Sequence, residues 1–343
     1  MAVNILFITH RFYPDVGGIE VNSEILALAF HQAGHAVHVV TWTQRPGDKS
    51  FPYVVLRNPS LPALLKQHQW ADVVYENNPS LRLSWPALLF HKPSVVAIRT
   101  WITRTDNEIA WQDKLKQRWL QRAAAVIAVS EAVRKKSWPA ATVIGNPYRV
   151  ALFRIMPEVA RTRSFVFLGR LVSDKGADLA IQAIAQLKTT MTQSSTPLLT
   201  IVGDGPDRAL LEALALSLEV KDQVVFMGAL EGEKLVVCLN QHQFLLVPSR
   251  WEEPFGNVAL EGMACGCIPI VSDGGGLPDA VGEAGLCFPR GSVEGLLDCM
   301  RSVVQNPARA QQLRAAAAAH LAAHHPALVG GKYLQVIEQA LKK

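Results

Sequence analysis

The sequence predicts an α/β protein with two domains, each built on a doubly wound, parallel β-sheet. The chain has 343 residues, of which 49% are hydrophobic, and this length exceeds what one core usually spans. Short runs of Val, Ile and Leu alternate with stretches of helical periodicity, as buried parallel strands and their crossover helices do. The alternation stops near residue 147 and starts again near residue 164. Two domains follow from this interruption.

The first series of elements predicts a domain over residues 1–155. Its strands are expected at residues 3–9, 36–42, 53–56, 72–75, 94–98, 124–129 and 142–144. Most of these are continuous apolar runs, which indicates burial on both faces of a sheet. Between the first two strands, residues 19–33 place Val21, Ile25 and Leu28 at the spacing of one helix face.

The second series predicts a domain over residues 156–326, after a stretch of little periodicity that we interpret as the interdomain linker. Strands are expected at residues 164–168, 198–202, 224–227, 244–247 and 268–271, and helices at residues 175–187, 206–218, 233–240 and 257–265. Two successive βαβ series predict two sheets with a cleft between them. We expect the last helix, 327–343, to pack back on the first domain.

Charge is distributed unevenly between the two halves. Residues 1–155 contain 18 Lys and Arg against 10 Asp and Glu, whereas the remaining residues contain 16 against 19. The excess indicates either a surface for anionic lipid headgroups or an acidic substrate, or only solvated helix faces. The basic runs lack interleaved aromatic residues, so the sequence does not favour a nucleic acid as partner.

The cysteines and the N-terminal run bear on the cellular compartment. All five cysteines lie between residues 238 and 299 in apolar surroundings, and Cys265-Gly266-Cys267 lacks the partner pair of a metal site. We predict buried thiols in a reducing compartment. The N-terminal apolar run has no basic lead and predicts a strand rather than a signal peptide, and no run is long enough to span a bilayer. We therefore expect a cytoplasmic protein.

The most specific motif is a pair of glutamates, Glu253 and Glu261, which bracket the stretch Pro254-Phe255-Gly256-Asn257-Val258-Ala259-Leu260. A Pro, an aromatic-Gly step and an apolar run are typical of a strand-to-helix turn. Eight residues of helix make about two turns, so the second carboxylate is expected near the face of the first, roughly 12 Å further along. Two such carboxylates could bind the two ends of one long, hydroxyl-rich ligand, while the backbone N–H groups of the first helical turn bind its anionic or polar atoms.

Two glycine turns follow predicted strands, where open α/β sheets bind ligands. Gly17-Gly18 precedes the first helix and permits close approach of a phosphate to its N-terminus. Gly203-Asp204-Gly205-Pro206 resembles part of a dinucleotide fingerprint, but Arg208 stands at the third glycine position. A tight turn into a helix is the better interpretation of this second stretch.

A basic loop follows the first strand of the second domain. Within Gly169–Gly176, Arg170 supplies a bidentate fork and Lys175 a point charge. These are the groups expected to hold a diphosphate that gains negative charge as it leaves. The alternative is that Arg170 pairs with a surface carboxylate and Lys175 merely opens a helix.

Taken in order, these motifs resemble one family over nearly the whole chain: the retaining, metal-independent nucleotide-sugar glycosyltransferases of family 4, which have two Rossmann-like domains in the GT-B fold. The glutamate pair, which begins with Glu-Pro-Phe-Gly, is specific to this family. Each glycine is individually common, and the glycines support the resemblance only as an ordered series. The residues that carry the resemblance are Gly17-Gly18, Gly169-Arg170, Lys175-Gly176, the turn 203–206, Phe226-Met227-Gly228, Pro248-Ser249, the Glu253 and Glu261 pair and the segment 261–272.

The resemblance implies a role for each matching residue. Arg170 and Lys175 would grip the diphosphate, Glu253 would bind sugar hydroxyls, and these three form the expected catalytic centre. Glu261 would hold the ribose hydroxyls of the nucleotide. The other implied donor contacts are Gly17, Gly18, Gly203, Met227 and Gly228, the last two beside the base, together with the backbone N–H groups of Phe255, Gly256, Asn257 and Val258.

The sequence departs from the family after the fifth strand of the first domain, where the family often places a His. The stretch here reads Arg99-Thr100-Trp101-Ile102-Thr103-Arg104. Trp101 offers a flat face to an acceptor ring or packs under a loop, and Arg99 or Arg104 offers a cation to an anionic acceptor. We take Arg99, Trp101 and Arg104 as candidates for acceptor binding. Asn146-Pro147 stands where the family tends to have Asn-Gly.

The resemblance implies transfer of a hexose from a nucleotide sugar to an acceptor hydroxyl, with retention, to form an α-glycoside. Neither a metal nor a cofactor is expected, and no D-x-D carboxylate pair occurs in the chain. UDP-glucose is favoured as the donor, with GDP-mannose and UDP-GlcNAc as alternatives. The acceptor is a small molecule, a glycan or a lipid, and peripheral membrane contact through the basic first domain stays open. The alternative functions are a nucleotide-sugar epimerase of the same fold and a non-catalytic nucleotide-sugar-binding protein.

Overall fold

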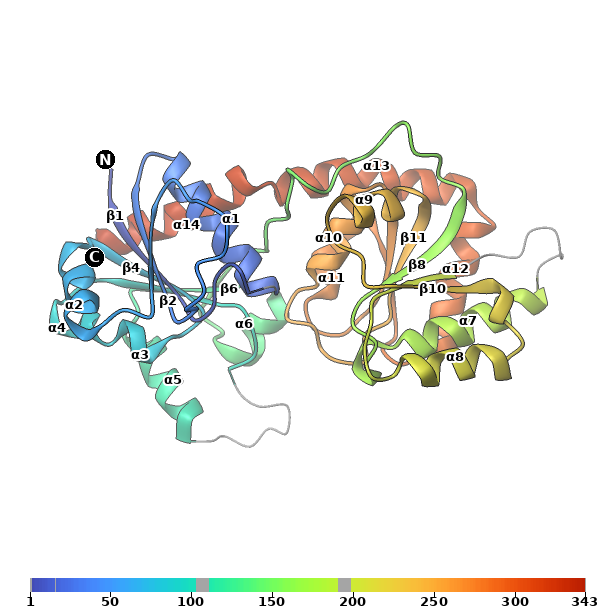
Figure 1. Ribbon diagram of the computed structural model, residues 1–343, viewed down its shortest axis with the longest axis horizontal. Helices are drawn as coiled ribbons and strands as arrows, with labels where there is room; N and C mark the ends of the chain where they lie inside the picture. The colour runs from blue at the N-terminus through green and yellow to red at the C-terminus, as the bar shows by residue number, and fades with distance from the viewer. Residues whose placement is uncertain (1, 16, 103–110, 191–198, 343) are drawn as a thin grey trace. The chain divides into compact units, whose positions relative to one another are not determined.

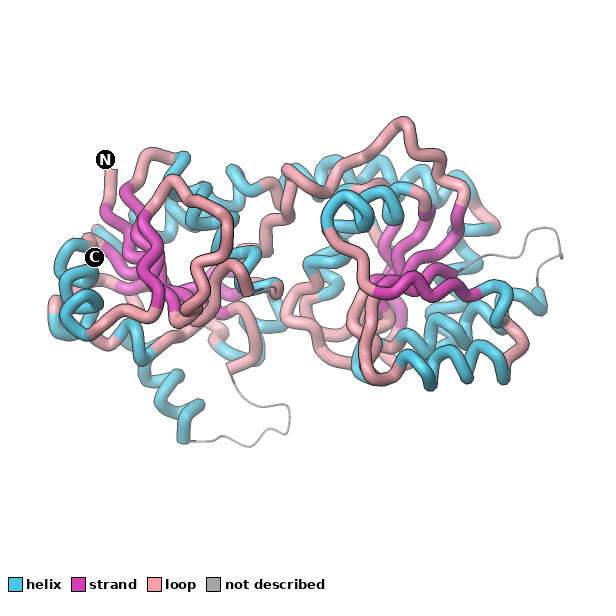
Figure 2. Tube along the Cα trace, in the orientation of Figure 1, coloured by secondary structure: helices cyan, strands magenta, loops and turns pink. Residues whose placement is uncertain are grey.

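The computed structural model of the protein describes residues 2–15, 17–102, 111–190 and 199–342. The chain forms two compact units, an N-terminal unit of Met1–Pro147 with His324–Lys343 and a C-terminal unit of Tyr148–Ala323. Each unit contains one sheet in which every strand pair is parallel, with helices on its faces (Figures 1 and 2). The predicted fold class, two doubly wound α/β domains, is confirmed.

The N-terminal unit has a seven-stranded sheet in the order β3-β2-β1-β4-β5-β6-β7. Each predicted strand is present, with ends that shift by one or two residues. Its strands are β1 (Asn4–Thr9), β2 (Ala36–Thr41), β3 (Val54–Arg57), β4 (Val73–Asn77), β5 (Ser94–Ile98), β6 (Ala125–Ala128) and β7 (Thr142–Val143). Its helices are α1 (Gly18–Gln32), α2 (Leu61–Trp70), α3 (Leu81–Ser84), α4 (Pro86–Leu89), α5 (Trp111–Arg122), α6 (Glu131–Ser137) and α14 (Pro326–Leu341).

Both faces of this sheet are buried. Along β1, Ile5 and Phe7 belong to one core, which also contains Tyr333 of α14 and residues of α1. Leu6 and Ile8 belong to a second core that includes residues of α2 and α3. The burial of successive residues on opposite faces explains why β1 is a continuous apolar run. The final helix, α14, lies beside α1 and completes the first of these cores (Figure 1).

The C-terminal unit has a six-stranded sheet in the order β10-β9-β8-β11-β12-β13. Its strands are β8 (Arg163–Leu168), β9 (Leu199–Val202), β10 (Val224–Gly228), β11 (His242–Val247), β12 (Ile268–Ser272) and β13 (Leu286–Phe288). Its α-helices are α7 (Ala177–Thr190), α8 (Arg208–Ser217), α9 (Gly232–Asn240), α10 (Asn257–Ala264), α11 (Leu277–Val281), α12 (Val293–Val304) and α13 (Pro307–Ala323). The helix predicted from residue 175 starts only at Ala177, because Ser173–Lys175 form a separate 3-10 turn.

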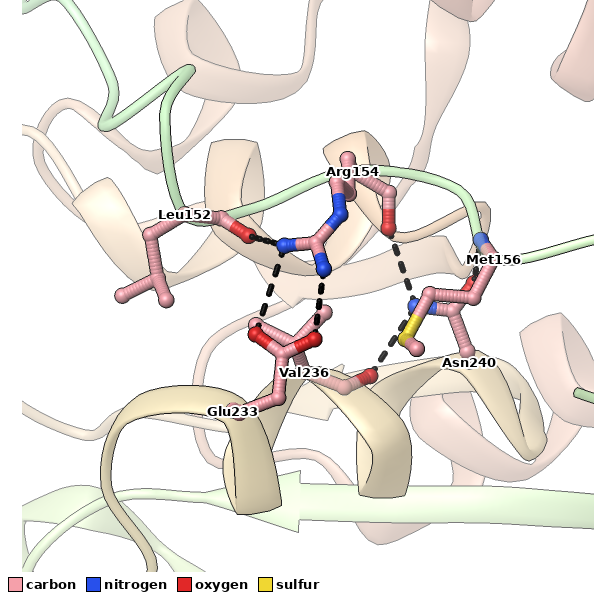
Figure 3. Close-up of polar contacts among 6 residues, drawn as sticks. All are labelled: Leu152, Arg154, Met156, Glu233, Val236 and Asn240. Carbon is pink, nitrogen blue, oxygen red and sulfur yellow. Dashed lines mark hydrogen bonds and ion pairs between the residues drawn. The ribbon is translucent and has the colours of Figure 1, made fainter.

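The segment 148–162, within the predicted linker, packs on the helices of the C-terminal unit. Arg154 donates from both terminal guanidinium nitrogens to the carboxylate of Glu233 on α9, at 2.5 and 3.3 Å (Figure 3). The side-chain amide of Asn240 donates to Arg154 O at 2.9 Å and accepts from Met156 N at 2.8 Å (Figure 3). Asn240 is fully buried, so these bonds fix the segment to the end of α9.

The prediction of buried thiols is confirmed for Cys238, Cys265 and Cys267, and all five cysteines are free thiols. It is wrong for Cys287, which is exposed. Cys287 lies on β13, the edge strand of its sheet, where one side is left open. Among helices of the described residues, none has both the length and the apolar character that a bilayer crossing requires.

Candidate active site

The strand order of the C-terminal unit brings the loops after β8 and β11 together. These two strands are hydrogen-bonded neighbours, but the chain continues from β8 to β9 on one side and from β11 to β12 on the other. Such a reversal leaves a crevice beyond the carboxyl ends of the two strands, where open α/β sheets bind ligands. Arg170 and Lys175 follow β8 and Glu253 follows β11, so the topology assembles the three predicted catalytic residues at this crevice.

Lys175 and Glu253 are in direct contact. Lys175 Nζ lies 2.5 Å from Glu253 Oε1, and the two side chains are only 19% and 15% exposed. The hydroxyl of Ser249 lies 3.2 Å from the same carboxylate oxygen and 3.1 Å from the carbonyl oxygen of Asp174, and its one proton is shared between these two acceptors. Lys175 Nζ also lies 5.2 Å from the ring centre of Trp251, within cation–π range. The crevice therefore holds a fixed cation and a fixed carboxylate in a largely dry setting.

Backbone contacts between the two loops hold this pair in place. The carbonyl oxygen of Asp174 accepts bonds from the N–H groups of Arg250 and Trp251, at 2.8 and 3.2 Å. The guanidinium of Arg250 binds both carboxylate oxygens of Asp178 at 2.6 Å. Gly176 has φ +72°, and a Cβ there would lie 2.0 Å from the oxygen of Pro248. Only glycine permits this close approach of the loops, which brings Lys175 to Glu253.

Arg170 lies in the same loop as Lys175 but is exposed. Within the described part of the chain, no carboxylate pairs with its guanidinium. The alternative in which Arg170 is held by a surface carboxylate is therefore not seen. Its five N–H donors are available to a bound anion at the β8 end of the crevice.

The helix starts at residue 257, as predicted, so Glu253 and Glu261 do not share one helix, and the separation of two helical turns that we expected between their carboxylates is wrong. Gly256 is left-handed, with φ +110°, and α10 starts only at Asn257. Glu253 therefore lies in the loop before α10, where its carbonyl oxygen accepts from Gly276 N at 2.7 Å, and Glu261 lies one turn into the helix. The intervening Phe255 is 3% exposed, so any contact it makes with a ligand has to come from its backbone.

Glu261 lies in a largely buried position with an arginine partner. Its side chain is 16% exposed, and its Oε1 accepts from Nη2 of Arg149 at 3.2 Å. Burial raises the pKa of Glu261, while Arg149 acts to lower it. The guanidinium of Arg149 also lies 4.9 Å from the ring centre of Phe153. Sequence reasoning missed Arg149, because an ion pair across 112 residues leaves no local signal.

The predicted nucleotide contacts Gly203, Met227 and Gly228 follow the neighbouring strands β9 and β10. Gly203 N donates to Gly228 O at 2.8 Å, and a Cβ on Gly203 would lie 1.9 Å from the oxygen of Gly169. The ends of β8, β9 and β10 thus meet through glycine backbone, which agrees with the tight turn expected here. Met227 is 44% exposed and offers an apolar surface beside them.

In the N-terminal unit, Gly17 and Gly18 lie at the start of α1. Gly17 has extended backbone, and Gly18 is the first residue of this 15-residue helix. The N-terminus of a helix of this length favours an anion through its dipole and open N–H groups. The structure thus places both glycines at the helix start that the sequence indicated.

Arg99 is not the surface cation that we expected for an acceptor. It is 5% exposed, and its guanidinium donates to Asn77 Oδ1 at 2.6 Å, Asn146 Oδ1 at 2.9 Å and Tyr75 OH at 3.0 Å. It also lies 5.1 Å from the ring centre of Tyr333 on α14. An arginine can be buried without a carboxylate when its donors are satisfied in this way, so we assign Arg99 to the core of the N-terminal unit.

The other two acceptor candidates give a mixed result. Trp101 is half-buried, and Lys136 Nζ lies 5.0 Å from the centre of its ring. Its indole face thus already contacts a cation of α6. Arg104 lies outside the described residues.

Comparison with known proteins gives a consistent match to glycosyltransferases. Residues 152–320 match the family "Glycosyl transferases group 1". The chain is 29% identical to glycogen synthase from Mycobacterium tuberculosis over 231 residues, which cover 65% of this chain and 51% of that protein. It is 41% identical to D-inositol 3-phosphate glycosyltransferase from Acidothermus cellulolyticus over 130 residues, which cover 35% of this chain and 29% of that protein. The chain thus matches about half, or less, of the length of these relatives.

Among solved structures, Alr3699/HepE from Anabaena in complex with UDP aligns with a TM-score of 0.82 and 18% identity, covering 98% of this chain and 99% of that chain. Alr3699/HepE has also been solved in complex with UDP-glucose. At this identity the likeness shows a common fold of two α/β domains.

Proposed function

Because residues 152–320 match the family of group 1 glycosyl transferases, we propose that the chain is a retaining glycosyltransferase. It transfers a hexose from a nucleoside diphosphate sugar to an acceptor hydroxyl and forms an α-glycoside. The single observation that carries the proposal is the contact between Lys175 and Glu253 at the β8 and β11 crevice. It provides a cation for the diphosphate and a carboxylate for sugar hydroxyls at one place.

The reaction needs charge stabilisation more than a protein nucleophile. The bond between the anomeric carbon and the diphosphate oxygen breaks, and negative charge builds on the departing diphosphate. Lys175 and the exposed guanidinium of Arg170 stabilise this charge, because fixed cations in a water-poor site act without reorganisation. The acceptor oxygen then bonds to the anomeric carbon from the same face, and its proton passes to a diphosphate oxygen.

Glu253 and Glu261 have separate tasks in this scheme. Glu253 accepts hydrogen bonds from hydroxyls of the transferred sugar once the diphosphate attracts Lys175, and Ser249 keeps the carboxylate oriented. Glu261 accepts from the ribose hydroxyls of the nucleotide, and Arg149 favours its ionised form by acting to lower the pKa that burial raises. First-turn N–H groups of α10 face the donor, as helix N-termini do with anions.

We propose UDP-glucose as the donor. The complexes of Alr3699/HepE with UDP and UDP-glucose support this choice. The reaction is proposed to need neither a cofactor nor a divalent cation, so chelation with EDTA should leave the rate unchanged.

The test is to incubate the full chain with each nucleotide sugar, with and without acceptor candidates, and to separate the nucleotides by chromatography. We expect release of UDP from UDP-glucose that increases with the correct acceptor, and NMR of the product should give an α-anomeric coupling. An isomerised donor formed without any acceptor identifies an epimerase instead. Binding of the donor without nucleotide release under any condition identifies a non-catalytic binding protein.

A further inference from the structure

A second hollow lies wholly within the N-terminal unit. Its volume is about 380 Å³, within the lower range of small-molecule sites. It opens beyond the carboxyl ends of β1 and β2, the edge at which parallel α/β sheets bind ligands. It is lined by His10, Arg11, Asp15, Trp42, Thr43, Gln44 and Arg45, and we call it the β1–β2 pocket.

The floor of the β1–β2 pocket is fixed by hydrogen bonds between the two loops. Thr43 is buried, and its hydroxyl accepts from Phe12 N at 3.0 Å and donates to Asp15 Oδ2 at 2.8 Å. The backbone N–H of Trp42 donates to His10 O at 3.2 Å. The loops after β1 and β2 are therefore joined before any ligand arrives, which reduces the entropy cost of binding.

The charge of the pocket favours an anion. Arg11 and Arg45 are both exposed, and in the described part of the chain neither guanidinium has a carboxylate partner. Asp15 is the single carboxylate of the lining, and its Oδ2 already accepts from Thr43. The pocket thus has two guanidinium groups and one carboxylate, which is already hydrogen-bonded, so its net charge is positive. The planar guanidinium of arginine matches the geometry of a phosphate or a carboxylate.

Trp42 gives the pocket an apolar wall. Its indole packs against the core that includes Leu6 and Ile8, yet the side chain is only half-buried, so part of the ring faces the pocket. An anchored aromatic face beside polar groups suits a sugar or cyclitol ring, whose C–H face packs on the indole while its hydroxyls reach polar partners such as Gln44.

We propose that the β1–β2 pocket binds the acceptor of the transfer reaction, and that this acceptor is a ring compound bearing a phosphate or a carboxylate. Arg11 and Arg45 bind the anionic group, and Trp42 packs against the ring. This inference rests on the proposed glycosyltransferase function. It names a class of acceptor and replaces Arg99, which is buried, as the source of positive charge for it.

Binding to the full chain is measured by calorimetry with matched anionic and neutral probes: glucose 6-phosphate with glucose, glucuronate with glucose, and glycerol 3-phosphate with glycerol. For at least one pair we expect the anionic probe to bind about tenfold or more tightly, and its affinity to fall with added salt. A phosphate or carboxylate carried by a lipid is tested with vesicles of phosphatidylglycerol against vesicles of phosphatidylcholine.

The double variant carries Arg11→Gln and Arg45→Gln. The control is Arg82→Gln, which also removes an arginine charge, from an exposed site on α3. The double variant should lose the preference for the anionic probe, and Arg82→Gln should keep it. Trp42→Ala should weaken glucose 6-phosphate more than glycerol 3-phosphate, because only the former has a ring. A preference seen only with vesicles, and lost in the double variant, assigns the anion to a lipid headgroup.

The proposal is overturned if no anionic probe or vesicle is preferred, or if the double variant keeps the preference. It is also overturned if the double variant loses UDP-glucose binding, since the pocket would then serve the donor. Thermal shift with UDP-glucose separates this outcome from failure of the proposed function. Absence of donor binding by the unmodified chain rejects the glycosyltransferase, whereas normal donor binding with unchanged anion preference in the double variant rejects only the acceptor site.

Discussion

Arg149 and Glu261 form an ion pair across 112 residues of sequence, with Nη2 of the arginine 3.2 Å from Oε1 of the glutamate. Arg149 lies at the start of the C-terminal unit and Glu261 one turn into α10. Burial raises the pKa of Glu261 above its ordinary value of 4.5, and the guanidinium opposes this shift. The ion pair thus favours the ionised form of Glu261, whereas burial favours the neutral acid.

Removing this arginine should make stability depend more strongly on pH. In Arg149→Met the pKa of Glu261 rises further above its value in the unfolded chain, so the folded state retains a proton that the unfolded state has released. The free energy of unfolding then decreases as pH rises through this interval. We expect a loss of about 1–2 kcal/mol at neutral pH, less than for a fully buried pair because Arg149 is partly exposed.

Urea denaturation at about pH 5 and about pH 7.5 measures this effect. Glu261→Gln removes the titrating group, so the variant that combines it with Arg149→Met should lose the additional pH dependence. Parallel pH profiles for Arg149→Met and the unmodified chain would contradict the prediction.

Glu261→Ala should act mainly on donor affinity. If the carboxylate binds ribose hydroxyls equally in the ground state and the transition state, its loss raises the KM for the nucleotide sugar and leaves kcat nearly unchanged. Initial rates over a range of donor concentrations separate the two parameters. Glu283→Ala, at an exposed glutamate of the same unit, is the control, and a fall in kcat alone for Glu261→Ala rejects ribose binding.

Lys175→Ala should lower both rate and stability. We expect kcat to fall on the order of a hundredfold, as for the loss of one strong transition-state donor. The melting temperature should also fall, because Glu253 is 15% exposed and loses its cation. Lys234→Ala removes an exposed lysine from α9 and should change neither quantity. Turnover near normal in Lys175→Ala would remove this residue from the mechanism.

Arg170→Ala should lower the rate without lowering the stability of the fold. Its side chain is exposed, so thermal denaturation of the variant is expected to match that of the unmodified chain, while the rate falls on the order of a hundredfold. Arg309→Ala, also at an exposed position, serves as the charge-matched control. A rate equal to that of the control would show that the diphosphate does not depend on Arg170.

Gly176→Ala tests the close contact of the two loops that carry Lys175 and Glu253. Gly176 and Gly291 both have left-handed backbone, with φ +72° and +80°, but only at Gly176 would a Cβ clash, 2.0 Å from Pro248 O. Gly291→Ala should cost about 1 kcal/mol for its backbone conformation alone. Gly176→Ala should cost more and also lower the rate by displacing Lys175. Equal melting temperatures in the two variants would contradict the steric argument.

The fold was predictable because burial leaves a direct trace in the sequence. Central strands such as β1, with Ile5, Leu6, Phe7 and Ile8, are apolar on both faces, and such runs stand out from the helices between them. The short edge strand β13, which the sequence did not indicate, has only three residues and one open side.

The candidate site was predictable only in part. Arg170, Lys175 and Glu253 each follow a strand, and their meeting depends on the strand order, which the resemblance implied. The contact between Arg149 and Glu261 and the burial of Arg99 depend on tertiary packing that no local pattern encodes. The start of α10 at Asn257 was predicted correctly, but the two-turn separation expected between Glu253 and Glu261 was not, because the left-handed backbone of Gly256 leaves Glu253 outside the helix.

The bonds of Asn240 determine where the second half of the protein can be cut. Its side chain binds the main chain on both sides of Ile155, and Arg154 binds Glu233. A recombinant fragment that began at the first strand, β8, would expose an orphaned amide and an unpaired acid on α9. A fragment that began at Tyr148 would keep the partners of Asn240 and Glu233, and also Arg149, the partner of Glu261, so we expect it to fold as an autonomous unit.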